Sequence, residues 1–258
     1  GGSELSAAKV FDKASPTTLA FLELRYFPQG PFPSSKVTSN FTSLVHLDFH
    51  IDLSTPSSSV VPLLEGMYAF PALESLKVEA SWSNERGVYF CVDRNTTCTE
   101  TKTSPPALSP SIQNLKNLQH VEIAHIQGGS LPIELFLLPK LEYLSLSDVS
   151  FAPLLFETFV EYVGHSKSLK TLRLFETHWH NSSDTMPRQD FPNVGLIWRH
   201  TPIQELKLGW DDLSFRGAPI SVAPFLDLPL LSTLDLCRAQ VCTLRSCNQS
   251  FARVLDNS

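Results

Sequence analysis

Apolar side chains recur in one short pattern along most of this chain. In the pattern L-x-x-L-x-L, apolar residues fill the first, fourth and sixth positions. Eight units carry it, beginning at Leu19, Leu44, Leu73, Leu118, Leu141, Leu169, Ile203 and Leu231. Because a strand places alternate side chains on one face, the fourth and sixth positions point inward together. The pattern therefore predicts eight short strands, which bury their apolar edges by stacking on one another.

The eight units resemble leucine-rich repeats, and the resemblance runs from about Leu19 to Leu236. The steps between first positions are 25, 29, 45, 23, 28, 34 and 28 residues, and most fit the usual repeat length. The segments 108–118 and 129–141 are similar to the plant-type variant of the family. The resemblance implies an α/β solenoid with about eight parallel strands on its concave face. Helical, 3₁₀ and extended returns would cover the convex face.

The returns between strands differ in pattern. Residues 58–67 and 156–163 carry apolar residues at helical spacing, which predicts two helical returns. Pro110 and Pro132 lack a backbone donor and favour 3₁₀ or extended returns. We expect a cloning scar at 1–3, an N-terminal cap at 4–18, the solenoid at 19–236 with an insertion at 82–106, and a cysteine-containing C-terminal cap at 237–258.

The chain departs from the family at the ninth position of each unit. That position is usually an asparagine, whose side chain hydrogen-bonds neighbouring backbone. Here the ninth residues are Phe27, Asp52, Ser81, Ile126, Val149, Thr177, Asp211 and Ala239. No asparagine ladder can form, although the Asp, Ser and Thr residues are candidates for a partial substitute.

Composition narrows the classes of partner. The net charge is -6 and the isoelectric point is about 5.7, which argues against a general binder of nucleic acid or anionic membranes. No apolar run approaches the ~18 residues of a membrane span. The chain lacks G-x-S-x-G, G-x-G-x-x-G, phosphate-loop and H-E-x-x-H motifs, so we expect a non-catalytic protein without a cofactor or metal.

Cysteines and glycosylation signals point to the outside of the cell. Cys91 and Cys98 lie in the longest insertion, whereas Cys237, Cys242 and Cys247 lie together near the end. A bridge within each cluster is favoured over zinc, because the spacing of the cysteines suits zinc poorly. Reduced thiols in a cytosolic protein are the alternative. Four N-x-[ST] sequons, at Asn40, Asn95, Asn181 and Asn248, all fall in predicted connections or near the terminus.

The third, fifth and seventh positions of each unit should face the concave side, and they carry mixed charge with few aromatic residues. The candidate partner-binding residues are Tyr143, Arg173, Phe175, Lys207 and Trp210. Tyr, Trp and Arg are the residue types that dominate binding energy once desolvated. His46, Asp48 and His50 share one strand face, which is a weak signal for metal; polar surface histidines are the favoured alternative, followed by a pH-sensitive contact.

These observations favour an extracellular or cell-surface recognition module that binds a protein or peptide on a rigid concave face. The alternative is an intracellular sensor or substrate-adaptor domain with reduced cysteines and no glycans. A self-associating adhesive or structural protein is a third hypothesis. The sequence leaves the ligand and the oligomeric state open.

Overall fold

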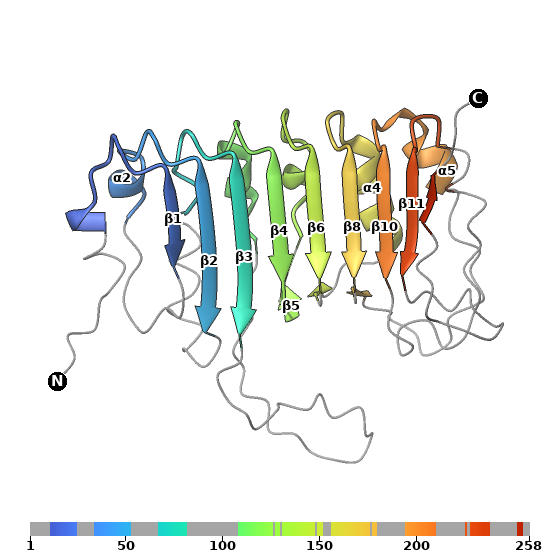
Figure 1. Ribbon diagram of the computed structural model, residues 1–258, viewed down its shortest axis with the longest axis horizontal. Coiled ribbons are helices and arrows are strands. Elements are labelled where there is room, and N and C mark those ends of the chain that lie inside the picture. The colour runs from blue at the N-terminus through green and yellow to red at the C-terminus, as the bar shows by residue number, and fades with distance from the viewer. Residues whose placement is uncertain are drawn as a thin grey trace, which may run out of the picture.

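The computed structural model describes residues 11–24, 34–52, 67–81, 108–125, 127–129, 131–147, 149–151, 156–175, 177–179, 194–209, 225, 228–237 and 252–254. One sheet of nine strands runs the length of the molecule (Figure 1). In spatial order its strands are β1 (Phe21–Leu24), β2 (His46–Asp52), β3 (Ser75–Ser81), β4 (His120–Ala124), β6 (Tyr143–Ser147), β8 (Thr171–Phe175), β10 (Glu205–Gly209), β11 (Thr233–Cys237) and β12 (Ala252–Val254). The first eight are parallel, and β12 is antiparallel to β11.

The strands pair unit by unit, without a register shift between the eight repeats. Leu144 of β6 lies opposite Leu172 of β8, which lies opposite Leu206 of β10. The same backbone clamp occurs at each junction: two successive N–H groups that enter a strand donate to one carbonyl of the preceding unit. Between β4 and β6, the N–H groups of Glu142 and Tyr143 donate to the Gln119 carbonyl at 2.8 and 3.0 Å. The predicted eight-strand array is confirmed.

Short elements cover the convex side of the sheet (Figure 1). They are α2 (Ser35–Thr38), η1 (Pro110–Asn114), η2 (Ile133–Leu135), α4 (Phe156–His165), α5 (Val194–Ile197) and η3 (Trp198–His200). The helix predicted at 156–163 and the two 3₁₀ returns beside Pro110 and Pro132 are therefore confirmed. Of the return predicted at 58–67, residues 58–66 lie outside the described residues. None of the helices that the structure describes has the length and apolar character needed to span a bilayer.

A second parallel sheet follows the carboxyl ends of three concave strands. It consists of β5 (Gln127–Gly129), β7 (Ser150–Phe151) and β9 (His178–Trp179). His178 and Trp179 are thus strand residues. They pair with Ser150 and Phe151.

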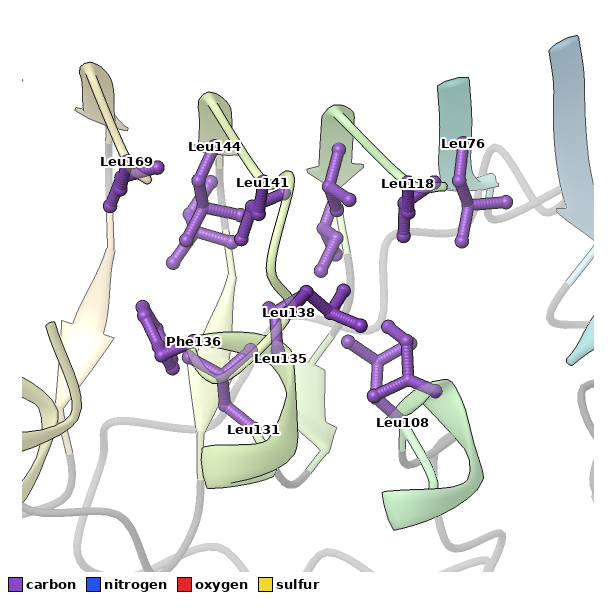
Figure 2. Packing of buried hydrophobic residues seen from close by; sticks show 14 of the residues in the cluster. Leu76, Leu108, Leu118, Leu131, Leu135, Phe136, Leu138, Leu141, Leu144 and Leu169 are labelled. Atoms are coloured by element: carbon purple, nitrogen blue, oxygen red, sulfur yellow. The ribbon is translucent and has the colours of Figure 1, made fainter. Parts of the chain in front are cut away.

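The core lies between the concave sheet and the returns. In the central units the first, fourth and sixth positions are buried, as in Leu141, Leu144 and Leu146. Leu141 and Leu144 face Leu135 and Phe136 from the η2 return (Figure 2). One buried ring also makes a polar contact: Nε1 of Trp198 donates to the Val160 carbonyl at 2.8 Å. This bond ties η3 to α4.

Residues from outside the eight units contact the stack near each of its ends. Phe11 is buried and packs edge-on against Phe41, with ring centroids 4.9 Å apart. At the other end β12 pairs with β11. The domain boundaries given above stay predictions.

Candidate partner-binding surface

The register places three rows of side chains on the concave face. The third positions form one row: Phe21, His46, Ser75, His120, Tyr143, Thr171, Glu205 and Thr233. The fifth form the next: Glu23, Asp48, Lys77, Glu122, Ser145, Arg173, Lys207 and Asp235. The burial pattern alternates along β4, β6 and β8, and these rows are the half-buried positions.

Tyr143 sits in the middle of the third-position row with both ring faces occupied. The His120 ring, from the strand on one side, stacks on it with centroids 3.9 Å apart and planes 6° apart. From the strand on the other side, the Arg173 guanidinium carbon lies 5.1 Å from the ring centroid. Such stacking and cation–π contacts hold the ring in place. Tyr143 therefore offers a partner its edge and hydroxyl rather than an open aromatic face.

Arg173 and Lys207 converge on one carboxylate. Oε1 of Glu205 lies 3.0 Å from Nη2 of Arg173 and 3.1 Å from Nζ of Lys207. Partial burial by itself would raise the pKa of Glu205, but hydrogen bonds from Lys207 and Arg173 hold that pKa below its ordinary value. Glu205, a third-position residue, thus already neutralises part of the positive charge of Arg173 and Lys207, the two cations predicted to contact a partner.

The structure brings together three of the five predicted contact residues. Tyr143 and Arg173 are in contact, and Lys207 joins them through Glu205. Phe175 lies on the same strand face, two residues beyond Arg173, and is half-buried opposite Ser147 and Gly209.

The fifth predicted residue, Trp210, lies outside the described residues. We call Tyr143, Arg173, Phe175 and Lys207 the Tyr143 patch. His120 and Glu205 contact the residues of this patch. The repeat pattern places both on the concave face as third positions, but it gives no sign that they contact the patch.

A second network occupies the strands nearer the N-terminus. Nζ of Lys77 lies 3.4 Å from Glu79 and 3.8 Å from Asp48, and Nε2 of His50 lies 3.0 Å from Glu79. The His46 ring stacks on Phe21 instead, with centroids 4.6 Å apart.

The metal hypothesis for His46, Asp48 and His50 gains no support from this geometry. Within the described part of the chain, no three Cys, His, Asp or Glu side chains are placed to hold a metal ion. The histidines on this strand make ring and carboxylate contacts, in line with the favoured alternative of polar surface residues.

Most of the modification sites lie outside the described residues. They are Cys91, Cys98, Cys242 and Cys247 among the cysteines, and Asn95, Asn181 and Asn248 among the sequons. Cys237 is the last residue of β11. Asn40 lies in the turn after α2 and is exposed, as an N-glycosylation site has to be.

At the two ninth positions whose side chains are described, Val149 and Thr177, no side-chain hydrogen bond takes the place of the asparagine ladder. Thr177 is fully buried, and its hydroxyl has no hydrogen-bond partner among the described residues. Val149, at the same place one unit earlier, is also buried.

Comparison with solved structures finds distant similarities at low sequence identity. No family model matches the chain, and no curated protein matches it. Internalin C2 of Listeria monocytogenes is 14% identical, with a TM-score of 0.40, over 83% of this chain and 79% of that one. An internalin F of the same organism is 11% identical, with a TM-score of 0.31, over 90% and 80%.

A leucine-rich repeat protein of Leptospira interrogans is 18% identical, with a TM-score of 0.29, over 83% of this chain and 60% of that one. Similarities this low say nothing about the partner of this chain. The assignment rests on the chain itself: eight L-x-x-L-x-L units form eight parallel strands that pair in register, with an unbroken backbone clamp between them. The chain is a leucine-rich repeat solenoid.

Proposed function

We propose that this solenoid is a non-catalytic recognition module, which binds a protein or peptide on its concave face. The preorganised Tyr143 patch is the observation that carries the proposal. Tyr143, Arg173 and Lys207 are held by contacts with His120 and Glu205 before any partner arrives. A surface ordered in advance loses little conformational entropy on binding.

The chemistry of the patch suits a polypeptide partner. The patch offers a partner the ring edge and hydroxyl of Tyr143, and the half-buried ring of Phe175. It also offers the hydrogen-bond donors of Arg173 and Lys207, which both contact the Glu205 carboxylate. Tyr and Arg are over-represented among the residues that dominate protein interfaces. Backbone amides and mixed side chains of a protein segment would match this set of donors, acceptors and apolar edges.

A selection experiment tests the binding proposal. A displayed peptide library is selected on the immobilised chain, and the recovered peptides are measured against Arg173→Gln and Arg199→Gln variants. Arg199 is exposed on η3, on the convex side, so its variant removes the same charge away from the concave face. We expect at least a ten-fold weakening with Arg173→Gln and less than two-fold with Arg199→Gln, since hot-spot truncations cost more than about 1 kcal/mol. Equal effects of the two variants would refute concave-face binding.

We also propose that the chain works at the cell surface or outside the cell, as a disulfide-bonded glycoprotein. The clustered cysteines and four sequons support this, together with the exposure of Asn40. Expression through a secretory pathway, followed by intact mass before and after N-glycan removal and a thiol count, tests it. Glycan mass and at most one free thiol are expected. Five free thiols without glycan would favour the intracellular adaptor.

A further inference from the structure

One histidine contacts the Tyr143 patch directly. The His120 ring stacks on Tyr143 with centroids 3.9 Å and planes 6° apart, while its Nε2 atom lies 3.0 Å from Oε1 of Glu122. An ionised carboxylate only accepts hydrogen bonds, so Nε2 carries the hydrogen of the neutral ring, and Nδ1 is the atom left to take up a proton. The His120 side chain keeps 39% of its surface exposed, so it can exchange that proton with water.

The charged and titratable groups around His120 come from three strands and their lead-in segments. They are Lys77 and Glu79 on β3, Glu122 on β4 itself, Tyr143 on β6 with Arg173 of β8 beyond it, and the exposed lead-in residues Glu74 and Glu142. Histidine is the residue type whose charge ordinarily changes between about pH 5 and 8, whereas carboxylates, phenols, ammonium and guanidinium groups ordinarily titrate outside that range.

The environment keeps the charges of the neighbouring groups constant in that range. A hydrogen bond from His120 holds the pKa of Glu122 below its ordinary value. Burial raises the pKa of Tyr143, so the phenol stays neutral. Burial by itself would lower the pKa of Lys77, but the carboxylates around it raise that pKa, so the ammonium group stays charged. Around the patch, the charge that changes near neutral pH is therefore that of His120.

One added proton alters the charge balance of the patch. With His120 neutral, the positive charges of Arg173 and Lys207 are matched by the negative charges of Glu205 and Glu122. With His120 protonated, the same group carries one net positive charge. The His120 ring lies 3.9 Å from the Tyr143 centroid and the Arg173 guanidinium carbon lies 5.1 Å from it, so the new charge is within about 9 Å of that guanidinium.

We propose that protonation of His120 makes the Tyr143 patch bind segments with Asp or Glu side chains more tightly as the pH falls from about 7.5 to about 5.5. This inference rests on the proposed protein-binding function and adds its regulation by pH. His120 acts as a positioning residue, through the ring of Tyr143 and the charge beside Arg173. A partner carboxylate at Arg173 gains roughly two- to five-fold in affinity from a unit charge about 9 Å away in a partly solvated site.

The test repeats the displayed-library selection on the intact chain at pH 7.5 and at pH 5.5. The recovered peptides are labelled, and their fluorescence anisotropy is measured with each protein at both pH values. His120→Phe keeps a flat ring on Tyr143 but cannot gain a proton. His46→Phe is the matched control, because His46 lies in the same third-position row and also stacks on an aromatic ring, that of Phe21, two strands away from β4. Thermal unfolding at both pH values confirms that the variants are folded.

We expect the peptides selected at pH 5.5 to be richer in Asp and Glu than those selected at pH 7.5. They should bind the wild type and His46→Phe roughly two- to five-fold more tightly at the lower pH, and His120→Phe equally at both. An equal gain in His120→Phe, or no gain in the wild type, would overturn the inference. If the peptides still lose affinity in Arg173→Gln in that case, the protein-binding function stands and only the pH dependence falls. If no peptide is recovered at either pH, both fall.

Discussion

Glu205 bridges two cations. Because of this bridge, the effect of a Lys207 substitution on stability should change sign when Glu205 is absent. Arg173 and Lys207 lie opposite each other on neighbouring strands, and both contact Oε1 of Glu205, at 3.0 and 3.1 Å. Removing Glu205 deletes two ion pairs at once and leaves two cations facing each other. Lys207→Met should therefore destabilise the wild-type chain but stabilise the Glu205→Gln variant.

The magnitudes follow from geometry and exposure. The three side chains keep about a third or less of their surface exposed, at 31% for Arg173, 28% for Glu205 and 27% for Lys207. Solvent screening holds such a pair to about 0.5–1 kcal/mol. Glu205→Gln should then cost about 1–2 kcal/mol, and Lys207→Met about 0.5 kcal/mol in the wild type. Like charges on directly opposed strand positions repel by a similar amount, so Lys207→Met should recover about 0.5 kcal/mol in the Glu205→Gln background.

Urea unfolding of the four proteins at neutral pH and low salt gives the free energies of this cycle. Glu142→Gln is the matched control. Its ion pair with Lys170 is equally short, at 2.8 Å, but involves one cation and side chains that are about half exposed, so it should cost less than about 0.5 kcal/mol. The difference between the stability effects of Lys207→Met in the two backgrounds should shrink in 0.5 M salt. If Lys207→Met destabilises both backgrounds equally, Glu205 does not act as a shared bridge.

Three further predictions concern the scaffold and its pH dependence. A Cβ on Gly164 would lie 2.7 Å from Cγ2 and 3.2 Å from the carbonyl oxygen of Ile197, so Gly164→Ala should lower the urea midpoint, with partial recovery in an Ile197→Ala background. Trp198→Phe should cost about 1–3 kcal/mol in the same assay, because it leaves a buried carbonyl of α4 without its 2.8 Å donor. A hydrogen bond from His120 holds the pKa of Glu122 below its ordinary value. The stability that the ionised Glu122 contributes to the folded chain should therefore be present above about pH 4.3 and be lost as the pH falls through the folded-state pKa. Stability measured against pH should be flatter in Glu122→Gln, and an unchanged profile would contradict this.

The sequence predicted those parts of the fold that repeat locally. Leu141, Leu144 and Leu146 show the burial expected of first, fourth and sixth positions, because alternation along a strand decides which side chains point inward. The helix at 156–165 and the 3₁₀ turn after Ser109 follow from apolar spacing and from a proline near the first turn. These signals lie within a few residues of one another.

The details of the candidate site depend on residues far apart in the chain. Tyr143 could be placed on the concave face, but covering its ring requires His120 and Arg173, which come from different units and must adopt matching side-chain conformations. No short-range pattern reports such a contact. The three strands of the second sheet are two or three residues long, too short for any periodicity in the sequence to predict them.

The Tyr143 patch would contribute to binding more through orientation than through net charge. Arg173 and Lys207 already share Glu205, so an acidic partner would have to displace an internal carboxylate to gain their charge. The Tyr143 patch is then better suited to hydrogen bonding and orientation than to net electrostatic attraction. A partner bound by this patch should therefore show a dissociation rate set by Arg173.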